Sequence, residues 1–347
     1  MLQDLIPKKQ VARVLELLMR SKKVAIVCHM TPDGDALGSS LCLWHLLRAV
    51  GKTATVVTPD CAPSNLMFLP GADSVVAASC HQERARYLFN GADLIFCLDF
   101  NDLKRIDRAA ALVGGSNAPI VVIDHHLNPS IDAEVLISHP EKSSTSALVY
   151  HLICQLGLEE YVTRESAECC CMGMMTDTGN FSYNSNDPDL YVILSRIVAK
   201  GVDKDALYAK LFNTNSLSRL RIMGYSQYAK MEVMPDHHCA VITLSREELD
   251  MFGYRKGDTE SLVNVPLSIP GVVYSIYLRE DAADYVKVSM RSKGDFSVKS
   301  LCETYFGGGG HLNAAGGEFA GSLSDALDTV LRIIPQCDGL VAQASDK

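Results

Sequence analysis

Continuous apolar runs recur through the first half of the chain and are separated by stretches with helical spacing of apolar residues. The runs at residues 23–28, 94–98 and 120–123 consist almost entirely of Val, Ile, Leu, Ala, Phe and Cys, and a shorter run covers residues 53–57. Runs of this length without polar alternation predict strands that are buried on both faces, as in a parallel sheet.

The stretches between and after these runs predict helices. They cover residues 11–19, the segment ending at Leu47, and residues 81–90, 145–156 and 167–176. Strands that alternate with helices predict an α/β fold, here with a doubly wound parallel sheet in the N-terminal part.

The pattern changes after residue 187. Residues 188–230 show only helical periodicity, and apolar strands then recur at 240–244, 272–278 and 286–290. A chain of 347 residues is too long for one core. We therefore expect an N-terminal domain at 1–187, a helical linker at 188–230 and a smaller C-terminal α/β domain with a mixed sheet at 231–347.

Charged and imidazole side chains stand where the apolar runs stop. The run at 120–123 ends in Asp124, His125 and His126, and the other polar residues of this kind are His29, Asp33, Asp35, Asp99 and Asp177. In an open parallel sheet, ligands bind beyond the carboxyl ends of the strands. These residues are therefore expected in loops at one edge of one sheet.

The chain contains a second Asp-His-His sequence, so the tripeptide alone does not identify a functional site. Asp236 to His238 follow Pro235 and precede an apolar strand, so we interpret them as a structural turn. The histidines outside any motif, His45, His81, His139 and His151, are also treated as structural or surface residues.

Carboxylates crowded into one cleft would repel each other strongly, and two divalent cations are the simplest compensation. Carboxylates with a minority of imidazoles suit manganese first, with magnesium or cobalt as alternatives, better than structural zinc. Two such ions roughly 4 Å apart can activate water and bind both oxygens of an in-line displacement at phosphorus. This reasoning predicts phosphoester hydrolysis.

The composition limits the binding partners and the cellular compartment that we expect for this protein. The net charge is −9, which disfavours a sequence-independent grip on long duplexes. The twelve cysteines have no paired C-x-x-C spacing and predict buried thiols in a reducing compartment. No apolar stretch is long enough for a bilayer. We expect a cytoplasmic protein without an obligate protein partner, and a homodimer remains open.

Four segments, HMTPDGDALGS, LDFND, IDHH and MMTDTGNF, resemble in order the four motifs of the DHH phosphoesterase family. The segment SMRSKGDFSVKSLCETYFGGGGHLNAAGGEF is similar to the DHH-associated domain of the RecJ-like branch of that family. Within this branch the chain resembles the short nano-RNase and phosphoadenosine-phosphate phosphatase (NrnA-type) members. The resemblance covers nearly the whole chain.

The resemblance implies roles for the motif residues. One metal would be held by His29, Asp33 and Asp99, and the other by Asp35, Asp99, His125 and Asp177, with Asp99 as the bridge. Asp124 and His126 would orient ligands or meet the substrate phosphate, so that Asp99, Asp124 and His126 form the catalytic group.

The C-terminal segment carries the expected substrate contacts. The glycine run Gly307, Gly308, Gly309 and Gly310, followed by His311, could form a nest of backbone amides for an anion. Arg291 and Ser292 resemble the Arg-Ser pair of the family, in which the guanidinium could bind a phosphate bidentately.

The expected substrates are short single-stranded RNA or DNA oligomers or small nucleotides such as 3′-phosphoadenosine 5′-phosphate. The alternatives are an inorganic polyphosphatase or pyrophosphatase and a linear or cyclic dinucleotide phosphodiesterase. The family's pyrophosphatases lack the Gly-rich histidine motif, so its presence in this chain weighs against a polyphosphatase or pyrophosphatase. A non-catalytic nucleotide sensor is the alternative outside enzymes, although such a protein would be expected to have lost a metal ligand.

Overall fold

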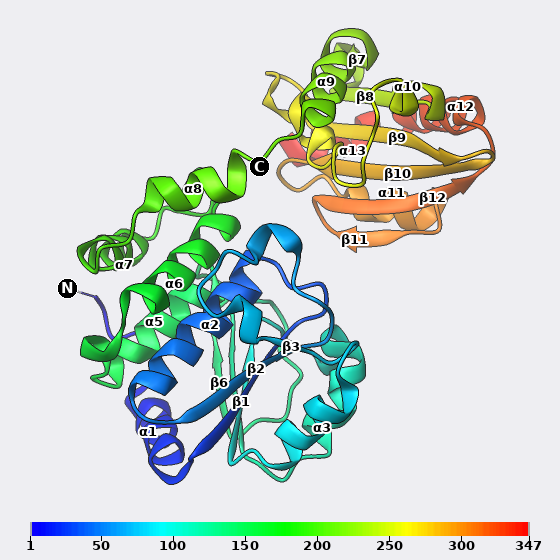
Figure 1. Ribbon diagram of the computed structural model, residues 1–347. Coiled ribbons are helices and arrows are strands. Elements are labelled where there is room, and N and C mark those ends of the chain that lie inside the picture. The colour runs from blue at the N-terminus through cyan, green and yellow to red at the C-terminus, as the bar shows by residue number, and fades with distance from the viewer. Residues whose placement is uncertain (1, 346–347) are drawn as a thin grey trace. The chain divides into compact units, whose positions relative to one another are not determined.

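The computed structural model describes residues 2–345, and the chain divides into two compact units, Met1–Thr214 and Asn215–Lys347 (Figure 1). Each unit has its own sheet and its own hydrophobic core.

The first unit contains a six-stranded sheet in the order β3-β2-β1-β4-β5-β6, and every neighbouring pair is parallel. The strands are β1 (Lys23–Cys28), β2 (Thr53–Thr58), β3 (Val76–Ala77), β4 (Leu94–Leu98), β5 (Ile120–Asp124) and β6 (Val135–Ser138). The four apolar runs of the sequence are thus β1, β2, β4 and β5, and the predicted parallel sheet is confirmed. The short edge strands β3 and β6 were not predicted.

Helices cover both faces of this sheet, because successive residues of each buried strand point to opposite sides. In β1, Val24 and Ile26 pack into one core, whereas Ala25 and Val27 pack into the other. The first face carries α1 (Lys8–Arg20), α2 (Gly34–Ala49), α5 (Thr145–Gln155), α6 (Arg164–Asp177), α7 (Pro188–Ala199) and α8 (Lys204–Phe212). The second carries α3 (Gln82–Asn90) and α4 (Ala110–Gly114).

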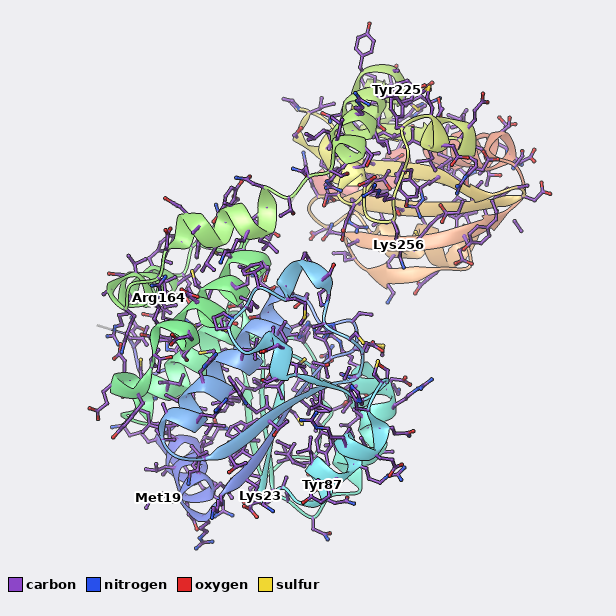
Figure 2. The ribbon with its side chains drawn as sticks, in the orientation of Figure 1. Met19, Lys23, Tyr87, Arg164, Tyr225 and Lys256 are labelled. Carbon is purple, nitrogen blue, oxygen red and sulfur yellow. The ribbon has the colours of Figure 1, made fainter. Side chains whose placement is uncertain are left out.

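Short 3-10 turns complete the first unit at Ser64–Leu66, Ala72–Ser74, Leu103–Ala109 and Glu159–Tyr161. Some large apolar side chains such as Met19 and Tyr87 are exposed on its surface, which is normal for a folded protein (Figure 2). None of the described helices is long and apolar enough to span a membrane.

The second unit contains a six-stranded sheet in the order β11-β12-β10-β9-β8-β7. The β8–β9 pair is parallel and the other pairs are antiparallel, so the predicted mixed sheet is confirmed. The strands are β7 (Met231–Met234), β8 (Cys239–Leu244), β9 (Tyr274–Ala282), β10 (Tyr285–Ser292), β11 (Gly309–His311) and β12 (Ala314–Ala320).

The two faces of this second sheet differ. One packs against α11 (Val298–Tyr305) and α12 (Leu323–Ile333) through Ile276, Val288 and Met290. The other holds a smaller apolar cluster and many polar residues. The remaining helical segments are α9 (Leu217–Tyr225), the π-helical turn Ser226–Lys230, α10 (Arg246–Met251), α13 (Asp338–Ser345) and the 3-10 turns Pro235–His237, Leu262–Ser268 and Ile334–Cys337.

Two predicted segments take forms that the sequence did not fully specify. The second Asp-His-His forms a 3-10 turn leading into β8, with His238 at φ 53°, which agrees with a structural turn. Within the glycine run, Gly309 and Gly310 enter the edge strand β11 and pair with β12. Glycine is depleted in strands, so sequence pattern alone does not predict this pairing.

Candidate metal centre

The predicted ligands meet at the carboxyl edge of the first sheet. His29 follows β1, Asp99 follows β4, and Asp124 ends β5 with His125 directly after it. Helix termini bring the rest: Asp33 caps the N-terminus of α2, Asp35 lies in its first turn, and Asp177 is the last residue of α6.

The nitrogen and oxygen atoms fall into two sets that share Asp99. His29 Nε2 lies 3.3 Å from Asp99 Oδ2 and 3.7 Å from Asp33 Oδ1. His125 Nε2 lies 3.3 Å from Asp177 Oδ2 and 3.4 Å from Asp99 Oδ1. Each oxygen of the Asp99 carboxylate therefore faces a different imidazole.

Asp35 completes the second set, with Oδ2 at 3.9 Å from His125 Nε2. The donor atoms of His29, Asp33 and Asp99 lie within 4.8 Å of one another, and so do those of Asp35, His125 and Asp177, a spacing that could hold a metal ion. Asp99 reaches the second group through His125. The structure thus brings together all six residues expected to be metal ligands.

His126 lies at the edge of the same cluster. Its Nδ1 is 2.7 Å from Asp124 Oδ1 and 3.8 Å from Asp99 Oδ1. Asp99, His125 and His126 also form a group close enough to hold a metal, so this imidazole has a ligand geometry that the sequence did not predict. Asp124 is fully buried, and its Oδ2 has no hydrogen-bond partner among the described residues.

Asp99 is held in an unusual backbone conformation. Its φ is +67°, a value that residues with a side chain rarely adopt, and the residue is almost completely buried. The Thr145 hydroxyl donates a 3.0 Å hydrogen bond to Asp99 Oδ1. Strained positions of this kind concentrate at functional sites, where surrounding contacts hold them in place.

The N-terminus of α5 fixes Asp35. The backbone amide of Thr145 donates to Asp35 Oδ2 at 2.6 Å, and that of Ser146 donates to Oδ1 at 2.8 Å. Helix N-termini favour negative charge, so the first turn of α5 partly compensates a carboxylate that has no solvent exposure. Sequence reasoning predicted this helix over residues 145–156 but missed that its free amides support the cluster.

A glycine on α6 leaves room for this arrangement. A Cβ atom at Gly173 would lie 2.6 Å from Asp35 Oδ1 and 2.0 Å from Ser146 Oγ. The two helices α2 and α6 can therefore approach closely enough for Asp35 to reach the α5 amides.

The pKa values show how strongly these groups interact. Burial, together with the charges of Asp177 and Asp99, raises the pKa of Asp35 well above its ordinary value. Burial also raises the pKa of Asp177 to about 6, despite the opposing hydrogen bond with His125.

In both imidazoles, burial and hydrogen bonding change the pKa in opposite directions. Burial disfavours their charged forms, but hydrogen bonds with the carboxylates outweigh it. Asp33 and Asp99 raise the pKa of His29 to about 10, and Asp177 and Asp99 raise the pKa of His125 to about 11. The carboxylates of both sets therefore strongly favour a positive charge beside them.

This donor set fits divalent cations. Carboxylate oxygen donors with a minority of imidazoles suit manganese, magnesium or a similar ion. The paired sets around Asp99 match the composition of a two-metal site, and the shared carboxylate fits the position of a bridge.

The predicted substrate residues lie in the second unit. Arg291 and Ser292 end β10, and their side chains point to opposite faces because they are adjacent in a strand. The Ser292 hydroxyl is buried, donates to the Phe296 carbonyl and accepts from Asn313 Nδ2. The side chain of His311 lies outside the described part of the chain.

The glycine run has two close approaches to β12. A Cβ atom at Gly308 would lie 1.9 Å from the Gly316 carbonyl oxygen, and one at Gly310 would lie 2.4 Å from that of Ala314. Only glycine fits these two positions, whereas Gly307 has open space around it at φ +57°.

Comparison with known proteins found matches in both units of the chain. The N-terminal domain of the DHH family matches residues 23–174, and the DHHA1 domain matches residues 240–337. The bifunctional oligoribonuclease and PAP phosphatase NrnA of Thermus thermophilus is 31% identical over 313 residues, which cover 90% of this chain and 89% of that protein.

Two further proteins are similar. Cyclic-di-AMP phosphodiesterase GdpP of Geobacillus thermodenitrificans is 27% identical over 321 residues, which cover 89% of this chain and 46% of that protein. The crystal structure of an exopolyphosphatase-related protein from Bacteroides fragilis superposes with a TM-score of 0.93 at 44% identity, covering 98% of this chain and all of that chain.

Fold, ligand cluster and matches together define the class of the protein, a hydrolase that acts on phosphoester bonds. The chain belongs to the DHH family and carries both a DHH and a DHHA1 domain. The resemblance inferred from the four sequence motifs is confirmed.

Proposed function

We propose that this protein is a two-metal phosphoesterase that hydrolyses short oligoribonucleotides from an end, and 3′-phosphoadenosine 5′-phosphate. The observation that carries the proposal is the pair of ligand sets that share the buried Asp99 carboxylate, with one imidazole and at least one further carboxylate in each. The names of the NrnA relatives support this substrate class.

His29, Asp33 and Asp99 would hold one cation, and Asp35, Asp99, His125 and Asp177 the other, with Mn²⁺ as the first choice and Mg²⁺ or Co²⁺ as alternatives. Bound there, the ions would supply Lewis-acid charge to phosphoryl oxygens and lower the pKa of water. The chain's own contribution is to fix the ligands: Thr145 orients Asp99, and the α5 amides orient Asp35.

Asp124 and His126 have a separate role in this proposal. The hydrogen bond to Asp124 keeps the His126 proton on Nδ1 and leaves Nε2 available. His126 Nε2 would then contact a phosphate oxygen or exchange a proton with the reacting oxygens, while the buried Asp124 holds the imidazole ring in place.

Substrate binding would fall to the C-terminal region. We propose that residues 1–187 form the catalytic domain and that 231–347 bind the substrate. Of the segment 188–230 expected to link them, α7 and α8 pack into the core of the first unit, which extends to Thr214. Arg291, the glycine run and His311 would receive the terminal phosphate, whereas the buried Ser292 hydroxyl, bonded to Phe296 and Asn313, would support the end of β10. The net charge of −9 supports short substrates, since long strands need extended phosphate neutralisation.

The test is an activity panel with purified protein and Mn²⁺. It contains RNA oligomers of two to five nucleotides, 3′-phosphoadenosine 5′-phosphate, cyclic and linear dinucleotides, polyphosphate and pyrophosphate, and a matched Asp99→Asn preparation controls for contaminating nucleases. We expect the oligomers and the bisphosphate to be cleaved fastest. If neither is cleaved above the Asp99→Asn level, the proposal is wrong.

Polyphosphate hydrolysis is the second candidate, because the 44% identical structure is described as exopolyphosphatase-related. The same panel decides between the two: phosphate release from polyphosphate that exceeds nucleotide release at equal concentrations of chain ends would favour this candidate.

A further inference from the structure

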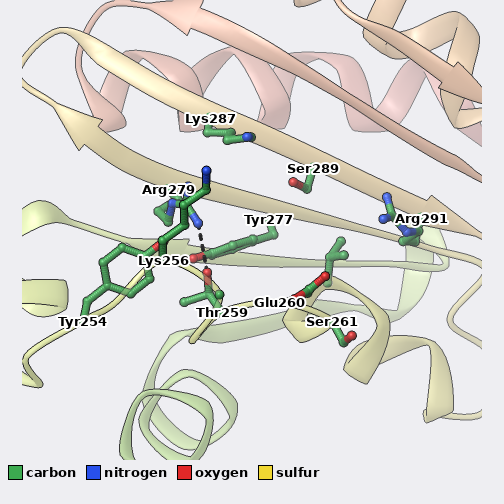
Figure 3. Close-up of a pocket in the computed structure, with 12 residues that line it drawn as sticks. Tyr254, Lys256, Thr259, Glu260, Ser261, Tyr277, Arg279, Lys287, Ser289 and Arg291 are labelled. Carbon is green, nitrogen blue, oxygen red and sulfur yellow. Dashed lines mark hydrogen bonds between the residues drawn. The ribbon is translucent and has the colours of Figure 1, made fainter. Parts of the chain in front are cut away.

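Several pockets among the described residues contain none of the candidate metal ligands. A pocket of about 320 Å³ in the second unit is lined by Arg291 and belongs to the substrate binding proposed above (Figure 3). Another pocket, of about 230 Å³, lies in the first unit and is lined by Cys61 and Cys80. The roles proposed above make no use of these two cysteines.

Cys61 and Cys80 differ from the other cysteines of the chain. The composition predicted buried thiols, and most of the twelve cysteines are buried, but these two are exposed and free. Their sulfur atoms lie 3.3 Å apart and share a hydrogen bond. Exposed thiols are open to oxidation, and two sulfurs already in contact can form a disulfide after a small further approach.

The backbone brings the two thiols together. Cys61 follows β2 and Cys80 follows β3, and these two strands pair in parallel. The pairing continues beyond the strand ends, where the amide of Ser79 donates a 3.0 Å hydrogen bond to the carbonyl of Pro59. The two segments therefore leave the sheet side by side, and the thiols meet because of the strand register.

Thiol pairs can also bind soft metal ions, but such sites need further ligands. Among the described residues, neither Cys61 nor Cys80 belongs to a group of three donor atoms close enough to hold an ion. His81 lines the same pocket, but it belongs to no such group either. The arrangement therefore favours oxidation of the thiols over metal binding.

We propose that Cys61 and Cys80 form a redox modification site, in which a hydroperoxide converts the two thiols to an intramolecular disulfide and small thiols reduce it again. Disulfides in a reducing compartment are usually transient and redox-sensing, which fits an exposed pair better than a structural bridge would. This chemistry is independent of the proposed phosphoesterase activity.

The oxidation is a two-electron reaction. The Cys80 thiolate attacks the peroxide and breaks its O–O bond, so that Cys80 becomes a sulfenic acid and the other peroxide oxygen leaves as an alcohol or as water. The sulfur of Cys61 then attacks the Cys80 sulfur, the S–S bond forms, and the sulfenic oxygen leaves as water with the Cys61 proton. Two thiols thus lose two electrons and two protons, and the peroxide accepts both.

The first attack is assigned to Cys80 because of the surroundings of Cys61. The hydrogen bond between the two sulfurs and the charge of Cys80 raise the pKa of Cys61. The thiolate is the reactive form of cysteine, so the protonated Cys61 is the poorer first nucleophile. Its proton is then available to the oxygen that leaves in the second step.

The thiol pair is linked to one set of candidate metal ligands. Asp60, which precedes Cys61, accepts a 2.9 Å hydrogen bond through Oδ2 from the backbone amide of Thr31. Thr31 lies between the candidate ligands His29 and Asp33 and has a φ of +47°. Because the sulfurs must move from 3.3 Å to about 2.05 Å apart, disulfide formation would shift the segment that carries Asp60.

We expect this shift to weaken the bond to Thr31 and to loosen the ligand loop. Partial loss of a hydrogen bond to a charged oxygen should weaken Mn²⁺ binding about three- to tenfold. This consequence, unlike the disulfide itself, rests on the metal site of the proposed function.

The test uses the full-length protein, first reduced and then treated with hydrogen peroxide. We expect the intact mass to fall by that of two hydrogen atoms and the number of thiols titrated in urea to fall by two from twelve. Peptide mapping should show Cys61 linked to Cys80, and dithiothreitol should restore both thiols.

Cys61→Ser and Cys80→Ser should each prevent disulfide formation. Cys154→Ser is the matched control, because Cys154 is partly exposed but lies on α5, and this variant should form the disulfide as the wild type does. The inference would be overturned if Cys61→Ser lost two thiols as the wild type does, or if mapping found oxidation only at other cysteines.

Calorimetric Mn²⁺ titrations of the reduced and disulfide forms test the link to the ligand loop. Asp60→Ala should weaken Mn²⁺ binding in the reduced form and remove most of the further effect of oxidation. Equal Mn²⁺ affinities of the two wild-type forms would refute the link. Absence of nucleotide cleavage by either form would refute the proposed function but not the disulfide, which is measured by mass.

Discussion

The close approach of α6 to Asp35 makes Gly173→Ala an informative substitution. The added methyl group would lie 2.6 Å from Asp35 Oδ1, 2.0 Å from Ser146 Oγ and 2.8 Å from Ser146 Cβ. Ser146 Oγ could rotate away, but its Cβ is fixed by the helix. Asp35 is fixed by two amide hydrogen bonds. The clash must therefore move either α6 or the Asp35 carboxylate.

The size of the effect follows from two opposing contributions. Replacing glycine by alanine inside a helix normally stabilises a protein by about 0.5–1 kcal/mol. Overpacking a rigid core costs about 1–3 kcal/mol. We expect a net loss of about 1–2 kcal/mol in the free energy of unfolding, accompanied by weaker Mn²⁺ binding and at least a tenfold lower kcat, because Asp35 is displaced from its ligand position.

Urea denaturation, calorimetric Mn²⁺ titration and turnover would be measured on the same preparations. Gly224→Ala is the matched control, since this glycine also lies in a helix, α9, but a Cβ atom there would meet nothing within 4 Å. It should stabilise the protein slightly and leave kcat unchanged. If Gly173→Ala behaves like Gly224→Ala in all three measurements, the argument that this glycine shapes the metal site is refuted.

Four further predictions concern the site, the substrate and stability. Asp99→Ala should abolish turnover with the fold intact by circular dichroism, and activity above about a tenth of wild type with unchanged metal content would contradict its bridging role. Arg291→Ala should raise KM about ten- to a hundredfold through loss of a charge-assisted contact, so an unchanged KM with collapsed kcat would show the assigned role to be wrong. Oligomers of two to five nucleotides should be cleaved faster per end than strands of a few tens of nucleotides, with weak salt dependence; equal or faster cleavage of the long strands would point to a processive enzyme. Burial, with the charge of Lys142 adding to it, lowers the pKa of His151 from 6.5 to about 4, so the unfolded chain binds more protons between these values. Stability is therefore retained above pH 6.5 and lost as the pH falls towards 4, by up to about 3 kcal/mol, and urea titrations at pH 4.5 and 7 should show a smaller difference for His151→Leu than for wild type.

The cluster of candidate ligands could be predicted from sequence because of where its residues stand. His29, Asp99 and His125 each follow a continuous apolar run, and the carboxyl ends of parallel strands meet at one sheet edge whatever the detailed packing. The parallel sheet itself was equally accessible, since strands buried on both faces leave an unbroken apolar pattern. The edge strands β3, β6 and β11 leave no such pattern, because they are short or rich in glycine.

What supports and extends the site was decided by tertiary structure. The α5 amides reach Asp35 across 110 residues of sequence, and Gly173 makes that contact possible only because α2 and α6 pack closely. The sequence by itself determined which side chains meet at the sheet edge, because the local pattern of apolar residues fixes where the strands end. Only the packed structure decided which contacts hold these side chains in place, because contacts between helices depend on residues far apart in the chain.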